Sequence, residues 1–204
     1  MPGRNIVKNY GAEQYYHIYS RGVAKQLVFR DDQDYRYLLS LFKRYLSIKP
    51  TTHKSHSNYP NFSKRLELIA YCLMPNHLHM LILQHDEYAM AKLMHTLLVS
   101  YCIYFNKKYE RVGPVFQSRY KASLINERSY LEHISRYIHL NPSDWQNYPY
   151  SSLPYYKQEL QAEWLKLGYV MTMFNNVGDY IKFLEDYESR KAYLEAIKKY
   201  LANC

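Results

Sequence analysis

Two apolar stretches separated by a proline and an asparagine constrain the fold of this chain more than any other feature. Residues 66–73 (LELIAYCL) and 77–84 (HLHMLILQ) have the length and the apolar character of buried strands. Pro75 and Asn76 favour a turn, and so short a connection joins antiparallel strands. The sequence therefore predicts a buried β-hairpin, and two histidines lie inside it.

The segments around the hairpin predict an α+β domain. Residues 15–21 (YYHIYSR) are aromatic and β-branched and stop at Gly22, as a strand does. Either Asp31 or Asp32 can cap a following helix. In chain order we predict a strand at 15–21, a helix at 34–48, the hairpin, a helix from Asp86 or Glu87 to about 109, a strand at 115–125 and a helix at 127–140. This β-α-β-β-α-β-α order is that of the split β-α-β, ferredoxin-like or RRM-like fold, with an antiparallel sheet and one added helix.

The chain divides into three regions of different character. We predict a basic N-terminal tail at 1–14, the α+β domain at 15–156 and a helical C-terminal extension at 157–204, with its helices at 163–174 and 179–201. A polar, basic loop at 49–64 interrupts the domain. The sequence leaves open whether the extension packs on the domain or reaches for a partner.

Charge and cysteine content narrow the classes of function. The formal net charge is +9 and the sequence pI about 9.2, which favours a polyanionic partner, most often nucleic acid. The 25 tyrosines can stack on unpaired bases, although tyrosine is also an ordinary packing residue. Three cysteines without a CxxC pair argue for free thiols in a reducing compartment. With no apolar segment of membrane-spanning length and no secretory signal, we expect a cytoplasmic protein without a membrane partner.

The two histidines of the hairpin are placed to act together. Residues i and i+2 of a strand point to the same face, so His77 and His79 project together while Leu78 and Met80 face the other way. Two neighbouring imidazoles can supply two ligands to one divalent metal. The alternative is that one histidine is an ordinary core residue and the other incidental.

The helix at 127–140 offers further groups for such a site. Tyr137 and Asn141 are four residues apart, so the phenol and the amide oxygen can approach one point. A tyrosine beside a divalent cation can act as a covalent nucleophile on a phosphate. Equally, Tyr137 could be an edge residue and Asn141 the stop before Pro142. On a helical wheel the buried stripe is Leu131, Ile134 and Ile138, and one edge of it carries Tyr130, Tyr137 and Asn141.

Several stretches together resemble one known family. MPNHLH at 74–79 resembles the HUH motif (histidine, bulky hydrophobe, histidine) of the single-tyrosine transposases that mobilise small bacterial insertion sequences. The most similar branch is that of the REP-associated tyrosine transposases, which is domesticated and linked to repetitive extragenic palindromes. The other similar stretches are YYHIYSRG at 15–22, VFRDDQDY at 28–35, FQSRYKAS at 116–123, YLEHISRYIHLNP at 130–142 and YPYSS at 148–152.

This resemblance implies a reaction and a site. It implies that His77, His79 and Asn141 hold one Mg²⁺ or Mn²⁺ ion on the sheet of a ferredoxin-like core. Tyr137 corresponds to the nucleophile, which cleaves DNA by transesterification and keeps a 5′-phosphotyrosine link. The implied protein is a single-stranded DNA endonuclease and strand-transferase that acts beside a hairpin, associated with the bacterial nucleoid. Relatives act as dimers or as monomers, so the oligomeric state stays open.

The same resemblance directs attention to basic residues and to one more histidine. We expect Arg119 and Lys121 to alternate on one strand, with Tyr120 facing the core. His17 resembles a family position to which we assign a supporting role beside the metal ligands. The candidate DNA-binding residues are Arg21, Lys25, Arg119, Lys121, Arg4 and Lys8.

Three alternatives stay open from the sequence. An HUH replication initiator or relaxase usually carries a third histidine or paired tyrosines, and Tyr130 shares a helix face with Tyr137. A catalytically idle protein could keep the fold and bind hairpin DNA. An RRM-like RNA-binding protein is disfavoured, because its aromatic strand pattern is missing.

Overall fold

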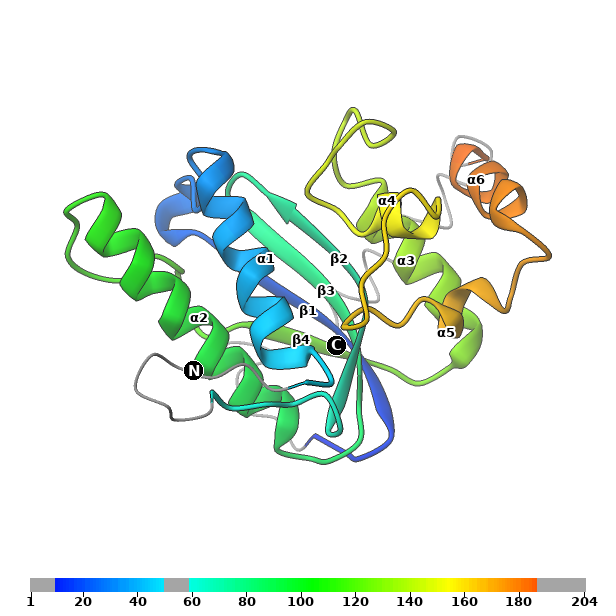
Figure 1. The fold of residues 1–204 in the computed structure, drawn as a ribbon, viewed down its shortest axis with the longest axis horizontal. Helices are drawn as coiled ribbons and strands as arrows, with labels where there is room; N and C mark the ends of the chain where they lie inside the picture. The colour runs from blue at the N-terminus through cyan, green and yellow to red at the C-terminus, as the bar shows by residue number, and fades with distance from the viewer. Residues whose placement is uncertain (1–9, 50–58, 187–204) are drawn as a thin grey trace.

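A four-stranded antiparallel sheet with strand order β2-β3-β1-β4 forms the centre of the fold (Figure 1). The computed structural model describes residues 10–49 and 59–186. The β-α-β-β-α-β connectivity and the strand order confirm the predicted ferredoxin-like α+β core. Its strands are β1 (Gln14–Arg21), β2 (Leu66–Met74), β3 (His77–Gln84) and β4 (Lys121–Ile125).

Helices follow the strands in the predicted order. The first begins as expected from its sequence, because the Asp31 side chain caps it by accepting a 3.1 Å hydrogen bond from the Asp34 backbone N–H. The helices are α1 (Asp32–Leu46), α2 (Ala89–Lys108), α3 (Leu131–His139), α4 (Leu153–Tyr156), α5 (Gly168–Met171) and α6 (Val177–Glu185), and two 3₁₀ turns are η1 (Val23–Lys25) and η2 (Arg128–Tyr130).

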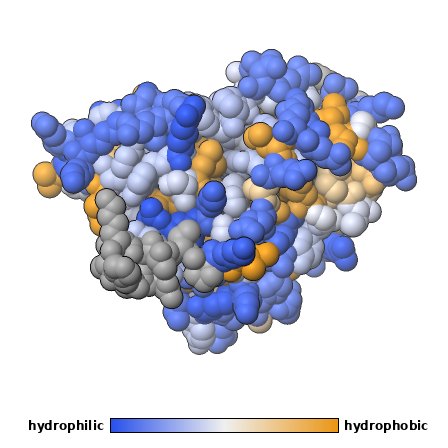
Figure 2. Space-filling view, viewed as in Figure 1, coloured by the Kyte–Doolittle hydropathy of each residue, from blue (hydrophilic) through white to orange (hydrophobic). Residues whose placement is uncertain are grey.

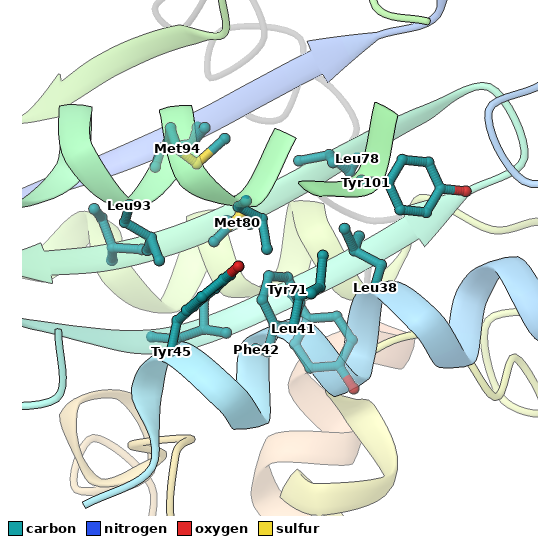
Figure 3. Packing of buried hydrophobic residues seen from close by; sticks show 14 of the residues in the cluster. Leu38, Leu41, Phe42, Tyr45, Tyr71, Leu78, Met80, Leu93, Met94 and Tyr101 are labelled. Carbon is teal, nitrogen blue, oxygen red and sulfur yellow. The ribbon is translucent and has the colours of Figure 1, made fainter. Parts of the chain in front are cut away.

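Helices α1 and α2 cover one face of the sheet. Leu78 and Met80 of β3 are fully buried beneath them, as the strand alternation predicted. Figure 3 shows side chains of both helices gathered over these strands, among them Leu38 and Phe42 of α1 and Met94 of α2. On the side of the molecule seen in Figure 2 hydrophilic residues predominate, and hydrophobic ones lie in separate patches.

Helix α3 packs on the opposite face, against β2 and β3. Its predicted stripe is correct, since Leu131, Ile134 and Ile138 are all fully buried. They join residues of odd number from β3, Leu81 and Leu83, in a second apolar cluster. His77 and His79 share that odd-numbered face, so α3 lies beside the histidine pair.

The described part of the C-terminal extension packs on the core, which answers the question that the sequence left open. Trp164 lies against Phe42 and Tyr71, with ring centroids 5.9 and 6.0 Å away. Tyr180 and Leu184 of α6 are fully buried in the cluster that contains α3. In Figure 1 the helices α4 to α6 lie together beside α3. The domain boundaries at 14/15 and 156/157 stay predictions.

Two predicted elements are shorter than expected. The strand predicted at 115–125 is β4 only from Lys121, because two extra residues interrupt its ladder with β1. Phe116 pairs with Gly22, where the register of β4 would place residue 118. The helix predicted at 163–174 is reduced to α5, because Leu165 instead forms a parallel bridge with Leu68 of β2.

Other predictions concern thiols, membranes and residues beyond the described ranges. Cys72 and Cys102 are free thiols, as expected. Among the helices in the described ranges, none is both long and apolar enough to cross a membrane. Arg4, Lys8, residues 50–58 of the basic loop and residues 187–201 of the last predicted helix lie outside the described residues.

Candidate active site

The turn between β2 and β3 is held by the segment that follows β1. The Asn76 carbonyl accepts a 2.8 Å hydrogen bond from the Gly22 backbone N–H. Gly22 is required at this close approach, because a Cβ there would lie 2.2 Å from the Gln26 carbonyl oxygen. The start of β3 is thereby fixed, and His77 and His79 are its first and third residues.

The neighbouring strand β1 places its own side chains beside the histidines. Arg21 pairs with His77 across the ladder and Tyr19 pairs with His79. Residues directly opposite each other in a ladder share one face of the sheet. The face that carries the histidine pair therefore also carries His17, Tyr19 and Arg21.

Asn141 approaches the histidines from the helix side. Helix α3 ends at His139, and Pro142 prevents a further helical turn, so Asn141 lies two residues beyond the helix. Its Oδ1 is 3.1 Å from His77 Nε2, and its Nδ2 is 3.4 Å from His79 Nε2. The structure thus brings the three predicted metal ligands to one point.

Hydrogen bonds fix the tautomers of both histidines. His77 Nδ1 lies 2.6 Å from Asn76 Oδ1, and an amide oxygen only accepts, so Nδ1 carries the ring proton. Asn76 keeps this orientation because its Nδ2 donates to the Lys25 carbonyl at 3.4 Å. His79 Nδ1 lies 2.9 Å from His17 Nε2. Burial lowers the pKa of His77 and holds that of His79 well below its ordinary value, so both rings are neutral.

The inward-facing atoms suit a divalent cation. With its proton on Nδ1, His77 presents the lone pair of Nε2 to the lone pairs of Asn141 Oδ1, and no proton lies between them. A cation removes that repulsion. Two imidazole nitrogens and an amide oxygen form a mixed donor set, which suits Mn²⁺ better than Mg²⁺. Within the described ranges no three His, Cys, Asp or Glu side chains gather as a metal site, and the predicted third ligand, Asn141, is an amide instead.

Tyr137 lies directly beside the histidines. Its ring meets those of His17 and His79 edge-on, with centroids 5.8 and 5.4 Å apart and interplanar angles of 85°. Tyr130 lies in η2, seven residues earlier, which corresponds to about 10 Å along a helix axis. A paired-tyrosine enzyme would need both Tyr130 and Tyr137 at the site. Only Tyr137 lies next to the histidine pair, because Tyr130 is about 10 Å away along the helix axis.

The predicted cationic residues have different positions relative to the site. Arg21 is beside it, and its Nε is buried without a hydrogen-bond partner in the part of the chain that the structure describes. Lys121 pairs with Tyr19 from the other side and is exposed. Lys25 is exposed in η1, next to the histidine turn. Arg119 is exposed but precedes β4, so the predicted alternation of Arg119 and Lys121 on one strand is wrong.

Sequence reasoning missed one residue of the site. That residue is Tyr19, whose ring lies 4.9 Å from the ring of His79 and 5.7 Å from the ring of His77. The Arg21 guanidinium lies 5.2 Å from the centre of the Tyr19 ring. The signal was present, because Tyr19 falls two residues after His17 and two before Arg21 on one strand.

Comparison with known proteins identifies the family. Residues 13–141, more than half of the chain, match the family model described as "Transposase IS200 like". The chain belongs to this transposase family. The matched segment contains the histidine pair, Tyr137 and Asn141, and the predicted resemblance to the single-tyrosine transposases is confirmed at the level of the family.

A solved structure has the same fold as this transposase. It is described as "Structure of the REP associates tyrosine transposase bound to a REP hairpin", with 14% sequence identity and a TM-score of 0.51. The similarity covers 79% of this chain and 90% of that one. A search of curated proteins found none that matches the chain.

Proposed function

We propose that this transposase is a metal-dependent, single-stranded DNA endonuclease and strand-transferase of the REP-associated type. Its substrate would be DNA with a hairpin, and its intermediate a 5′-phosphotyrosine. One observation carries the proposal: Tyr137 of α3 lies beside the histidine pair of β3, and Asn141 contacts both His77 and His79. A nucleophile and three ligands at one point are what such a reaction requires.

In the proposed reaction the phenolate oxygen of Tyr137 attacks the phosphorus of one phosphodiester while the P–O3′ bond breaks. The phenol proton leaves to solvent, and the departing 3′-oxygen takes up a proton from water. The phosphotyrosine ester keeps the free energy of the broken bond, so a 3′-hydroxyl can reverse the step without ATP. A divalent ion held by His77, His79 and Asn141 supplies positive charge at the phosphate when it is bound.

Residues of β1 and β4 favour a phosphate at this position. Arg21 pairs with His77 across the ladder, and its buried Nε is free to donate. Its guanidinium lies 5.2 Å from the centre of the Tyr19 ring. Lys121 adds a second positive charge on the same face. The ring of Tyr19 between them can stack on a base next to the scissile phosphate. Hairpin DNA is proposed because the solved structure with this fold is described with a REP hairpin.

A covalent-adduct assay tests the proposal. The protein is incubated with a labelled hairpin-bearing single strand and Mn²⁺, and the products are separated on a denaturing gel. We expect a protein–DNA band that disappears with a chelator and in Tyr137→Phe. The matched control is Tyr130→Phe, which removes a phenol from the same side of the helix but away from the histidines, and it should keep the band.

The other outcomes distinguish the alternatives. DNA binding without cleavage or adduct under any metal would leave the idle hairpin-binding protein. An adduct that survives in Tyr137→Phe and is lost in Tyr130→Phe would move the nucleophile to η2 and favour a different HUH enzyme.

A further inference from the structure

The side of α3 that faces away from the histidines is joined to α6 through one buried hydroxyl. The Tyr180 side chain is fully buried, and its OH lies 3.0 Å from Ser135 Oγ and 2.7 Å from His139 Nδ1. Ser135 and His139 flank Tyr137 at two residues on either side. Tyr180 therefore contacts α3 at two positions that are one turn apart, one before and one after Tyr137.

These hydrogen bonds form one connected series, and the direction of each bond follows from the tautomer of His139. In one arrangement the direction runs from Ser152 toward Glu132. Ser135 Oγ donates to the Glu132 carbonyl at 2.8 Å, so it accepts from the Tyr180 hydroxyl. The Tyr180 oxygen in turn accepts from His139 Nδ1–H. His139 Nε2 is then an acceptor, and it accepts from Ser152 Oγ–H at 2.6 Å. Ser152 Oγ also lies 3.2 Å from the Tyr71 carbonyl, which is its acceptor in the opposite arrangement. In either arrangement the buried polar groups are satisfied only while α3 keeps this position.

The series ends on the sheet that carries the histidine pair. Ser152 Oγ accepts a 2.9 Å hydrogen bond from the Tyr71 backbone N–H of β2, the neighbour of β3. A second contact holds the same helix, since Arg136 Nη1 donates to the Phe183 carbonyl of α6 at 3.1 Å and its guanidinium stacks on the Phe183 ring at 4.0 Å. Helix α3 is thus fixed between the sheet and α6.

Small rotations of α3 matter at this site. A helical side chain ends about 6 Å from the helix axis, so a rotation of about 10° moves it by about 1 Å. A displacement of about 1 Å at a reacting group can lower a rate by about 100-fold. We propose that Tyr180 is a positioning residue for this reaction, and that through it the C-terminal extension holds Tyr137 and Asn141 against the histidine pair of its own chain. This inference rests on the proposed function of Tyr137.

Tyr180→Phe tests the proposal, because it removes the hydroxyl and keeps the ring. The matched control is Tyr156→Phe. Tyr156 is equally buried, its ring stacks on Tyr180 at 5.1 Å, and its hydroxyl donates to the Ile69 carbonyl of β2 instead of to α3. Both variants lose one buried hydroxyl, and only one of them loses a contact with α3.

Two measurements are made well below the unfolding temperature. In single-turnover cleavage of the hairpin strand, we expect Tyr180→Phe to lower the rate at saturating DNA by about 10-fold, with the DNA concentration for half-maximal rate unchanged. In hydrogen exchange without DNA or metal, the amides of residues 135–139 should exchange faster in Tyr180→Phe, while those of β2 do not. Tyr156→Phe should leave the rate and the α3 exchange as in the wild type.

Equal effects of the two variants on rate or on α3 exchange would overturn the proposal, since both would then report a general loss of stability. A raised half-maximal DNA concentration with an unchanged saturating rate would overturn it too. If the wild type forms no adduct, the proposed function fails, and the exchange comparison still decides whether Tyr180 holds α3.

Discussion

His79 has only one ring nitrogen available to a ligand, because His17 Nε2 lies 2.9 Å from the other. His17 is buried, and burial lowers its pKa to about 4, so its ring is neutral. Asn141 Nδ2 donates to His79 Nε2, so the ring proton of His79 is on Nδ1 and is donated to His17 Nε2. At the proposed metal site, this contact would keep the lone pair of His79 Nε2 directed at Asn141. Partners of this kind fix the tautomer and orientation of metal-binding histidines.

We predict that His17→Phe weakens metal binding by about 10- to 100-fold, because His79 loses the acceptor that fixes its tautomer. Phenylalanine keeps the ring volume and removes both nitrogens. The measurement is calorimetric titration with Mn²⁺ in the absence of DNA. The control is His95→Gln, an exposed histidine of α2, which should bind as the wild type does. Equal affinities in His17→Phe and the wild type would mean that His79 needs no partner or is not a ligand.

At the scale of single residues, the sequence predicted what depends on strand alternation. His77 and His79 lie on one face because side chains alternate along a strand, and the supporting role assigned to His17 agrees with its contact to His79. The pairing of Tyr19 with His79 could not be predicted in this way, because it depends on the register between β1 and β3, which are far apart in the sequence.

At the scale of elements, α1 and α2 are joined at one end by a buried carboxylate. Asp34 in the first turn of α1 is fully buried, and its Oδ1 lies 2.8 Å from Lys108 Nζ at the end of α2. It also accepts hydrogen bonds from the hydroxyls of Tyr104 and Tyr109, at 3.0 and 2.8 Å. A buried carboxylate needs such partners, so Lys108 fixes how the two helices sit together over the sheet.

We predict that Lys108→Met lowers the free energy of unfolding by about 3 kcal/mol, because Asp34 loses its only ion-pair partner among the described residues while remaining buried. Denaturant unfolding at pH 7 is the measurement. Lys107→Met is the control, since Lys107 is the exposed neighbour and its substitution should change the free energy by less than about 0.5 kcal/mol. Equal losses in the two variants would show that the buried pair adds no stability of its own.

Periodicity predicted the helices and strands that pack by their own apolar pattern. The stripe of α3 and both strands of the hairpin are examples. Periodicity gave the wrong element where the backbone forms hydrogen bonds with a distant strand instead of within a helix. Residues 163–167 have helical character, yet Lys166 N–H donates to the Leu68 carbonyl at 2.8 Å, and that edge bond replaces a helical turn. Pairing with a distant strand edge leaves no local signal in the sequence.

At the scale of the whole molecule, the C-terminal extension completes the core around α3. Its residues lie outside the matched family segment, which ends at residue 141. The extension nevertheless covers one side of His139, which is fully buried between Ser152 of the domain and Tyr180 of the extension. Burial lowers the pKa of His139 to about 3, so this histidine is neutral in the folded protein and couples the packing of the extension to pH.

The last prediction follows from that coupling. An unfolded histidine titrates near pH 6.5, so between about pH 6.5 and pH 3 the unfolded chain binds one more proton at this residue than the folded chain. The free energy of unfolding therefore falls as the pH drops through this window. Above about pH 6.5 the full stability contribution of the buried, neutral His139 is present. From pH 7 to pH 5 that contribution falls by about 2 kcal/mol.

Urea unfolding at pH 7 and pH 5, with a chelator present, measures this loss in the wild type and in His139→Gln. Glutamine does not titrate, so we expect the loss of stability between the two pH values to be smaller in the variant by about 2 kcal/mol. The other histidines whose pKa is lowered by burial, His17, His77 and His79, titrate in the same direction in both proteins and cancel in the comparison. An equal loss in both proteins would mean that His139 keeps an ordinary pKa, and the extension would then not bury it as tightly as the contacts with Ser152 and Tyr180 require.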